Sequence, residues 1–257
     1  MTKISAYIPV LNEEDKIEDA LKSITWVDEI IILDTGCTDN TINIAKKYTS
    51  NIIPYTFKGF GKLRNAGIDA CSNEWVLSID ADERCTQELA LEIKQLLTHK
   101  KKHVAYWIPR KNWLMGRWVK HSGWYPDYCQ PKLFLKHALR YRDDDLVHEG
   151  WDAQGSIGYL KGDVLHFSFQ HLSDIIRKID NYSELGAEKL ESNGVSGGLL
   201  KAVFRGSWAF LRIYILKLGF LDGKAGFIIA LTNFEGTFYR YAKLTWKKND
   251  WDVPPKV

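Results

Sequence analysis

Residues 75–83 read WVLSIDADE, and this stretch decides the fold. It begins with a largely apolar run, which is typical of a strand buried on both faces of a parallel sheet. Asp80 and Asp82 follow directly and flank one small residue. Because ligands in open α/β sheets bind beyond the carboxyl ends of the strands, both acids are expected at a ligand site.

Strand and helix patterns alternate around this stretch. Apolar runs predict further strands over residues 4–10, 29–34 and 52–55. Apolar residues at helical spacing predict helices over 13–24, 39–48, 62–70 and 87–97. This β-α-β-α order predicts an α/β fold with a mostly parallel sheet and helices on both of its faces.

The pattern changes twice further along the chain. After residue 100, short strands are expected near 104–110, 132–135, 158–160 and 164–168, around an aromatic stretch at 113–126. From residue 173 the pattern is mostly helical. We therefore expect an α/β domain over 1–172, with two halves over 1–100 and 101–172, and a helical extension over 173–257.

Composition places the chain among ordinary globular proteins. It has 257 residues, of which 45% are hydrophobic and 26% charged, so disorder is not expected. Its four cysteines show neither a C-x-x-C pair nor metal-ligand spacing, which favours reduced thiols in a cytosolic protein. No signal peptide is expected. The sequence contains no uncharged apolar stretch of about 18 residues, so no transmembrane helix is expected either.

The net charge of +3 conceals a local basic region. Residues 195–248 contain nine Lys or Arg and two acids, and they are also strongly apolar. On a helix over residues 199–216, Lys201, Arg205 and Arg212 fall on one face, and aromatic and aliphatic residues cover much of the rest. This pattern favours an anionic membrane surface over nucleic acid as the partner, with a helical pair packed on the catalytic domain or in a homo-oligomer as the alternative.

The acidic strand ends suggest a phosphate-bearing ligand. Two carboxylates can hold a hard divalent cation that also binds substrate phosphates, although a solvated turn has the same pattern. Asp34 ends a neighbouring strand and can accept a hydrogen bond from a nucleobase, while Arg64 at a helix start suits a diphosphate. The glycine pattern at 59–64 lacks the third glycine of a dinucleotide site, and no P-loop motif is present.

Four ordered motifs resemble the family 2 glycosyltransferases, which have the GT-A fold and use nucleotide-diphosphate sugars. They are IPVLNEE at 8–14, DTGCTDNT at 34–41, Arg64-Asn65, and LSIDADE at 77–83. Later motifs resemble the branch that includes bacterial lipopolysaccharide core glucosyltransferases: PRKN at 109–112, GWYPDY at 123–128, VHE at 147–149 and GFLDG at 219–223. Lys132 stands where many relatives have Arg, which weakens the case for a bidentate phosphate contact there.

The resemblance implies that residues 1–172 are the catalytic domain, with a nucleotide-sugar half over 1–100 and an acceptor half over 101–172, and it implies roles for individual residues. Asp82 would ligate Mg²⁺ or Mn²⁺ on the diphosphate, with His148 as the third ligand and His166 as the competing histidine. Nucleotide-sugar binding would fall to six residues: Pro9, Asn12, Glu14, Asp34, Arg64 and Asp80.

The acceptor side needs a general base, because the acceptor hydroxyl loses a proton when a sugar is transferred with inversion. Asp127 is the candidate base, and it matches the acceptor-side acid of the family. Glu149 and the acids at 143–145 are fallback candidates. Trp124 and Tyr125 precede Asp127 and are candidates for a sugar-stacking platform.

Together these features predict a metal-dependent, inverting glycosyltransferase on the inner face of the inner membrane, with no nucleic-acid partner. UDP-glucose or a similar nucleotide sugar is the expected donor, and a lipid-linked lipopolysaccharide inner core is the expected acceptor. Sugar transfer to a polyprenyl phosphate is one alternative. A catalytically inactive module that binds nucleotide sugar or membrane is another.

Overall fold

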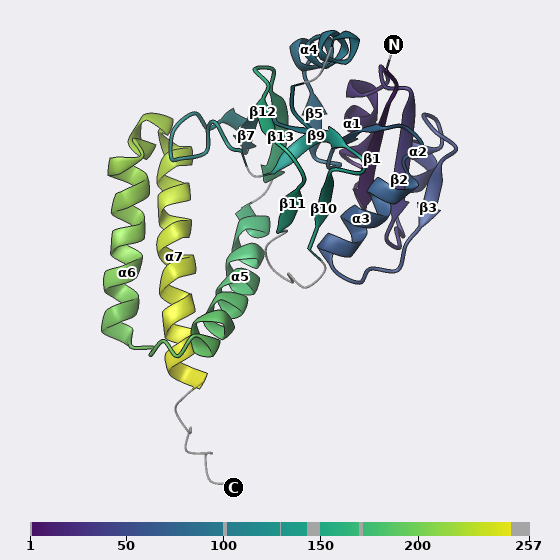
Figure 1. Ribbon diagram of the computed structural model, residues 1–257. Coiled ribbons are helices and arrows are strands. Elements are labelled where there is room, and N and C mark those ends of the chain that lie inside the picture. The colour runs from purple at the N-terminus through teal and green to yellow at the C-terminus, as the bar shows by residue number, and fades with distance from the viewer. Residues whose placement is uncertain (1, 100–101, 129, 143–149, 170–171, 248–257) are drawn as a thin grey trace, which may run out of the picture. The chain divides into compact units, whose positions relative to one another are not determined.

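The apolar strand sequences of the N-terminal half form one side of a seven-stranded sheet in the computed structural model, from its centre to one edge (Figure 1). The structure describes residues 2–99, 102–128, 130–142, 150–169 and 172–247. The strand order is β12-β6-β9-β4-β1-β2-β3. The bounds are β1 Ile4–Val10, β2 Glu29–Asp34, β3 Ile52–Pro54, β4 Trp75–Ser78, β6 Ala105–Trp107, β9 Pro131–Leu135 and β12 Ile157–Tyr159.

Parallel pairing dominates this sheet, as the alternating pattern predicts. β1 runs parallel to β2 and to β4, and β2 runs parallel to β3. β9 is antiparallel to both of its neighbours, β4 and β6, which makes the sheet mixed. The carboxyl ends of β1, β2 and β4 therefore meet at one edge, and the acidic motifs follow them there.

Helices cover both faces of the sheet because the side chains of β1 alternate between two apolar cores. Its even-numbered residues join the core beneath α1 (Ile17–Ser23), α2 (Thr41–Ala45) and α4 (Gln87–Thr98). Tyr7 points to the other face and packs with residues of α3 (Phe60–Ala70). Gly67 in α3 makes room for that ring, since a Cβ there would lie 2.5 Å from the Tyr7 side chain.

Smaller sheets complete the strand set. β5 (Glu83–Cys85), β13 (Val164–Phe169), β7 (Arg110–Leu114) and β8 (Arg117–Trp118) form a four-stranded sheet in that order. β10 (Leu139–Tyr141) pairs with β11 (Trp151–Ala153). β5 and β13 are antiparallel and pair Glu83 with His166, which brings the stretch after Asp82 next to a strand from 80 residues later.

The chain divides into two compact units, and the division runs through β7. The first comprises residues 1–112 and 126–168, and the second comprises 113–125 and 169–257. The chain passes between the units three times, and the last crossing, after residue 168, falls close to the expected boundary at 172. The expected acceptor half over 101–172 is nevertheless divided, because residues 113–125 group with the helices and the rest stays with the sheet.

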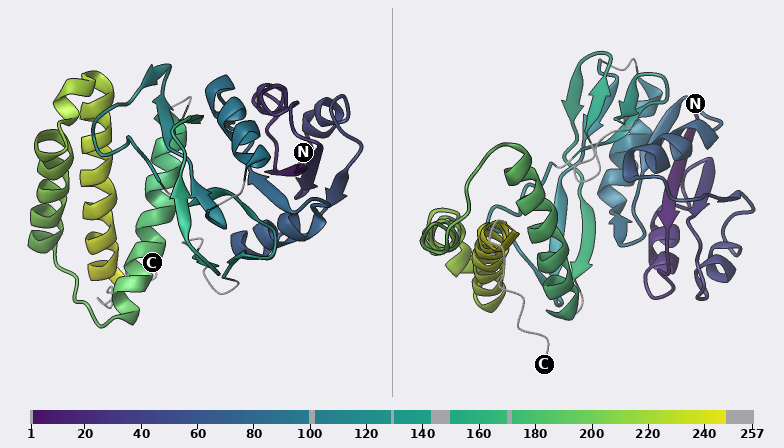
Figure 2. Two further views of the ribbon diagram at one scale, coloured as in Figure 1. Left: turned by 45° about the horizontal axis from the view of Figure 1, so that its top comes forward. Right: turned by 90° about the horizontal axis from the view of Figure 1, so that it is seen from below.

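The second unit is built from long helices, in agreement with the predicted helical extension. α5 (Leu172–Ser192) and α6 (Leu199–Leu211) each pack against α7 (Lys224–Lys247), as both views of Figure 2 show. A π-helical turn at Arg212–Leu216 and a 3-10 turn at Gly219–Asp222 join α6 to α7. Among the described residues, no helix combines the length and the hydropathy that a bilayer crossing requires.

Candidate active site

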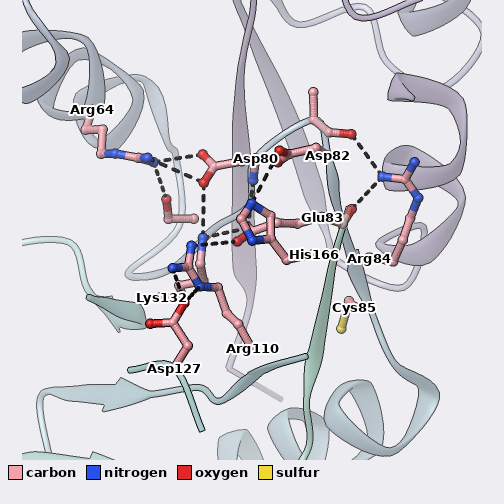
Figure 3. A network of polar contacts seen from close by, with 12 residues as sticks. Arg64, Asp80, Asp82, Glu83, Arg84, Cys85, Arg110, Asp127, Lys132 and His166 are labelled. Atoms are coloured by element: carbon pink, nitrogen blue, oxygen red, sulfur yellow. Dashed lines mark hydrogen bonds and ion pairs between the residues drawn. The ribbon is translucent and has the colours of Figure 1, made fainter. Parts of the chain in front are cut away.

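Asp80 and Asp82 lie in the turn between β4 and β5, at the carboxyl edge of the large sheet (Figure 3). Glu83 closes this turn. Its Oε2 accepts a hydrogen bond of 3.0 Å from the backbone N–H of Asp80, and its own N–H donates to the Asp80 carbonyl at 2.9 Å. The two predicted acids are therefore held in fixed positions by a third acid that follows them.

Two cations hold the carboxylate of Asp80. Arg64 Nη1 lies 3.0 Å from Oδ1 and Nη2 lies 3.4 Å from Oδ2, while Lys132 Nζ lies 3.4 Å from Oδ2. Burial alone would raise the pKa of Asp80, but the positive charges of Arg64 and Lys132 outweigh it and hold that pKa well below its ordinary value. Asp80 is therefore an anion whose charge is already balanced by the protein.

Lys132 is an internal countercharge. Its side chain is 1% exposed, and its Nζ lies 2.6 Å from Oε2 of Glu83, which is fully buried. Desolvation would lower the pKa of Lys132, but Asp80 and Glu83 raise it overall. Arg110 adds a second cation, with Nη1 3.7 Å from Oε1 of Glu83. Lys132 thus neutralises two acids inside the protein.

Asp82 is connected to Asp127 by a chain of polar contacts. His166 on β13 lies with Nε2 3.3 Å from Asp82 Oδ2 and Nδ1 2.6 Å from Oδ1 of Asn112 on β7. Nδ2 of Asn112 in turn donates to Asp127 Oδ2 at 3.1 Å. Because the Asp127 carboxylate can only accept, Asn112 presents its oxygen to His166, and Nδ1 of His166 carries a proton.

At the Asp82 end of this series of polar contacts, His166 controls the pKa of the carboxyl group. Burial would raise the pKa of Asp82, but the hydrogen bond and charge of His166 lower it overall. The position of His166 within a strand made it a weaker candidate than His148. In the structure, its side chain contacts Asp82, the predicted metal ligand. His148 itself, Glu149 and the acids at 143–145 fall outside the described residues.

The side chains of Asp82 and His166 fit a divalent cation that the substrate also ligates. No three His, Cys, Asp or Glu side chains of the described residues lie close enough to hold an ion by themselves. Mg²⁺ is commonly bound by one or two carboxylates together with substrate phosphates, so a protein cage is not required. Histidines that bind metals usually donate their other ring N–H to an oxygen acceptor, as Nδ1 of His166 does to Asn112.

Asp127, the predicted base, is oriented from one side only. Arg110 donates to its Oδ2 from Nε at 3.1 Å and from Nη2 at 2.5 Å, in addition to the bond from Asn112. Oδ1 accepts no hydrogen bond from the side chains that the structure describes, and the side chain is 30% exposed. A fixed carboxylate with one available oxygen is suited to accept a proton.

The predicted nucleotide-binding residues near the ends of β1 and β2 shape one loop. Asp34 Oδ1 accepts hydrogen bonds from the N–H groups of Gly36 and Cys37 at 3.0 and 2.8 Å. Burial would raise the pKa of Asp34, but these bonds lower it overall. The Cys37 thiol also hydrogen-bonds to Asp34 and contributes to the lowered pKa.

Asn12 and Glu14 hold the same loop from the β1 side. Oδ1 of Asn12 accepts from the Thr38 N–H at 2.8 Å, and Oε2 of Glu14 accepts from the Asn40 N–H at 2.9 Å. Pro9 lies within β1, opposite Leu33 of β2, and is half-buried. For Asn12 and Glu14, the structure shows loop-ordering contacts, and direct nucleotide binding stays a prediction.

The two aromatic candidates for a sugar platform belong to the second unit. Trp124 lines a cavity between α5 and α7, and Tyr125 packs edge to face on Trp118 with ring centroids 5.6 Å apart. Their predicted contact with a sugar stays a prediction.

The sequence alone did not reveal the roles of Glu83 and Asn112 or the burial of the Lys132 side chain. Glu83 is the last residue of the quoted DADE stretch, and a third acid beside two others was a signal that a buried cation must accompany it. Asn112 follows Arg110 in a motif that was noticed only as a resemblance. Its link to His166 joins strands 54 residues apart, which no local pattern reveals.

Comparison with known proteins agrees with this geometry. The model of the family described as Glycosyl transferase family 2 matches residues 5–155. The lipopolysaccharide core biosynthesis glycosyltransferase LpsC of Rhizobium meliloti (strain 1021) is 29% identical, over 94% of this chain and 91% of its own length. An uncharacterised glycosyltransferase of Rickettsia prowazekii (strain Madrid E) is 28% identical, over 95% of this chain and 87% of its own.

A solved structure supports the fold. Residues 1–349 of S. aureus TarS, crystallised in complex with UDP, superpose with a TM-score of 0.51 at 17% identity, over 92% of this chain and 91% of that one. This likeness, with the mostly parallel sheet and the helices on both faces, confirms the expected GT-A fold. With the family model matching more than half of the chain, the conclusion is direct: this protein belongs to glycosyl transferase family 2.

Proposed function

We propose that this glycosyltransferase moves glucose, with inversion, from UDP-glucose to the inner core of a lipopolysaccharide. The observation that carries the proposal is the polar chain that runs from Asp82 through His166 and Asn112 to Asp127. It connects a group suited to a leaving diphosphate with a group suited to deprotonate an acceptor. The name of the LpsC relative supports the acceptor, and the UDP bound to the TarS fragment supports the donor class.

On the donor side, each charged group has a task that the chemistry requires. Asp34 is placed to accept a hydrogen bond from the base, and Asp80, fixed by Arg64, is placed for the ribose. Asp82 and His166 would hold Mg²⁺ or Mn²⁺. A divalent cation bound there would stabilise the charge that develops on the departing diphosphate. Asp80 already balances Arg64 and Lys132, so the protein's own cations do not replace the metal.

On the acceptor side, Asp127 is the general base. Inversion requires the acceptor hydroxyl to attack the face of the sugar opposite the leaving group, and Asp127 removes the proton as the new bond forms. Arg110 and Asn112 fix Oδ2, so Oδ1 is the atom that receives the proton.

The second unit is the part that associates with the membrane. Five large apolar residues recur along α6 and the turn after it at a spacing of three or four residues, and all are exposed: Leu200, Phe204, Trp208, Leu211 and Ile215. The first two are 89% and 73% exposed. Arg205 and Arg212 flank this stripe and are exposed as well. An apolar stripe beside cations suits an anionic bilayer surface, which would bring a lipid-linked acceptor within reach on the cytoplasmic leaflet. A homo-oligomer that buries the stripe is the alternative.

The substitution Asp127→Asn tests the assignment of the base. UDP-glucose binding in the presence of Mn²⁺ should persist, because the carboxamide keeps the hydrogen-bonding shape and lies on the acceptor side. Transfer should fall by about 10²–10⁴-fold, the usual contribution of a positioned base. Calorimetry measures the binding, and release of UDP with a lipopolysaccharide acceptor measures transfer.

The matched control is Asp152→Asn, an exposed acid of the same unit that is paired with Arg142 and should change neither quantity. A collapse of donor affinity in Asp127→Asn would instead place Asp127 in the nucleotide site. Equal transfer to a polyprenyl phosphate would replace the proposed acceptor with that alternative.

A further inference from the structure

A cavity of about 330 Å³ opens within the second unit, between α5 and α7. Its apolar lining includes Ile175, Ile179, Ile229, Trp124 and Phe169, and its polar lining carries hydroxyl, amide and cationic groups. A cavity with an apolar wall and a few convergent polar groups is the usual form of a small-molecule site. A volume of this size accommodates a head group and the first part of one chain.

Gly236 keeps the cavity open along α7. It lines the cavity, and a Cβ at this position would meet no atom within 4 Å. Glycine in the middle of a 24-residue helix is less favourable than alanine, because it loses more backbone entropy on folding. Packing does not require that cost here, because a side chain would fit, so the free volume itself is the feature to explain.

Arg240 supplies a positive charge to the lining of the cavity. Its Nε is buried and has no hydrogen-bond partner among the described residues. Lys243, one turn further along α7, shows the contrast: its Nζ lies 2.7 Å from Asp180 and 3.3 Å from Glu184. A buried, unsatisfied guanidinium donor is costly unless a ligand pairs with it, and guanidinium geometry matches phosphate oxygens.

Lys178 places a second positive charge on the same cavity. Its Nζ lies 4.9 Å from the ring centroid of Phe169 and 5.4 Å from that of Tyr182. Both rings line the cavity, so the ammonium group is held at its edge. Both cations line the cavity, so an anionic group in it would lie among positively charged side chains from both helices, while an attached hydrocarbon would contact the isoleucines of the apolar lining.

We propose that this cavity binds a phosphorylated lipid, with the phosphate on Arg240 and Lys178 and the proximal part of one acyl chain along Ile175, Ile179 and Ile229. This inference rests on the proposed function, because a lipid-linked acceptor carries both an anionic group and hydrocarbon. It assigns the second unit the task of recognising that lipid.

Methyl NMR of the full-length chain labelled at isoleucine tests the proposal. Dihexanoyl phosphatidic acid, kept below its micelle concentration, should shift the methyl signals of Ile175, Ile179 and Ile229 in a saturable way. Phosphatidylcholine with the same chains should bind at least tenfold more weakly, because its phosphate is paired with a choline. Inorganic phosphate alone should leave the isoleucine signals in place.

Two variants and one control sharpen the result. Arg240→Gln should weaken binding roughly ten- to a hundredfold, the usual effect of losing a charge-assisted hydrogen bond. Gly236→Leu should abolish binding by filling the cavity, without lowering the thermal stability. Arg177→Gln removes an exposed charge from the same helix as Lys178 and should bind like the wild type.

Three results would overturn the proposal: equal affinity for both lipids, unchanged affinity in Arg240→Gln, or shifts confined to isoleucines outside the cavity. If Arg240→Gln unfolds, Lys178→Gln provides the same test of charge. The experiment contains no donor and no turnover, so its failure leaves the proposed transferase activity standing. If the transferase assay fails, the lipid titration still shows independently whether the cavity binds a phosphorylated lipid.

Discussion

Lys132 shows how one residue balances the charge of the active site. Its side chain lies between Asp80 and Glu83, and its backbone belongs to β9 in the middle of the sheet. Two acids placed side by side in a buried turn would repel each other and lose hydration. The lysine removes that penalty, so Asp80 stays charged and fixed while Asp82 remains available for a ligand.

Replacing Lys132 by methionine should therefore destabilise the fold by about 3–5 kcal/mol, because a buried charge pair loses one partner. The pH dependence gives a sharper test. The pKa of Lys132 is raised in the folded state, so its stabilisation is full below its ordinary pKa of about 10.4 and is lost as the pH rises through the higher folded value. The difference between wild type and variant should shrink above about pH 10.

Urea unfolding from pH 6 to pH 11 measures this difference. Asp80 does not change the comparison in this range, because its lowered pKa gives a stabilisation that is full above its ordinary pKa of about 3.9 and is lost only below it. Lys62→Met, which removes an exposed lysine from the same unit, is the control and should be nearly neutral. A difference between wild type and Lys132→Met that stays constant to pH 11 would show that folding does not raise the pKa of Lys132, which contradicts its charge pairing with Asp80 and Glu83.

At this scale the sequence supports the prediction of some site residues and not of others. Asp80, Asp82 and Asp34 were predictable because strand ends at one sheet edge converge whatever the details of packing. The link from His166 through Asn112 was not, because it depends on the register between β5, β13 and β7. A histidine within a strand reads as a core residue until the neighbouring strand is known.

At the scale of elements, the turn between α6 and α7 is organised by one buried acid. Asp222 accepts hydrogen bonds from the N–H groups of Lys120 and His121 and from the Ser122 hydroxyl, at 3.1, 3.0 and 2.8 Å. It is the Asp of the GFLDG motif, which the sequence showed only as a resemblance. It fastens residues 120–122 to the start of α7, which explains why that segment belongs to the helical unit and not to the sheet.

Asp222→Ala should loosen this connection by about 3 kcal/mol, because several buried donors lose their acceptor together. Amide hydrogen exchange should accelerate in residues 119–123 and in the first turns of α7, while β1 and β4 keep their protection. Glu191→Ala, an exposed acid at the end of α5, is the control and should leave the pattern unchanged. Equal acceleration in both units would contradict the separate role of Asp222.

The elements themselves were largely predictable, since each has a strong local signal. The strands β1, β2 and β4 are apolar runs, and α4 begins at Thr86, whose hydroxyl caps the Leu89 N–H at 3.2 Å. The short strands after residue 100 were harder to bound, because three-residue strands such as β6 and β12 have too few positions to show a period. The antiparallel course of β9 depends on a long connection, which the local pattern does not encode.

At the scale of the whole molecule, we propose sugar chemistry for the first unit and membrane association for the second. Lys201, one of the three basic residues predicted to share a face, is partly engaged: its Nζ donates to the Ser196 carbonyl at 2.9 Å and lies over the Tyr241 ring. Arg205 and Arg212 are exposed beside the apolar stripe of α6 and are the residues to change.

The double variant Arg205→Glu, Arg212→Glu should lose affinity for phosphatidylglycerol vesicles by roughly a hundredfold or more, since each charge near an anionic surface contributes about 1 kcal/mol. The effect should fade in high salt. Lys46→Glu, Lys47→Glu makes the same change in net charge on the first unit and should bind normally. Failure of the wild type to sediment with these vesicles, or a change of oligomeric state in the double variant, would show that the stripe is an interface between copies.

The central claim is that Asp82 and Asp127 together transfer a sugar from a nucleotide donor, and acceptor-dependent UDP release tests it most directly. A panel of nucleotide sugars is incubated with Mg²⁺ or Mn²⁺, with and without a lipopolysaccharide inner-core acceptor. With UDP-glucose and a divalent cation, we expect UDP to be released, and we expect the acceptor to stimulate this release. It also predicts that Asp82→Asn loses this release while its unfolding transition stays close to that of the wild type, since leaving-group stabilisation worth several kcal/mol is removed. Near-normal turnover of Asp82→Asn at saturating metal, or no release from any nucleotide sugar by the wild type, would contradict it.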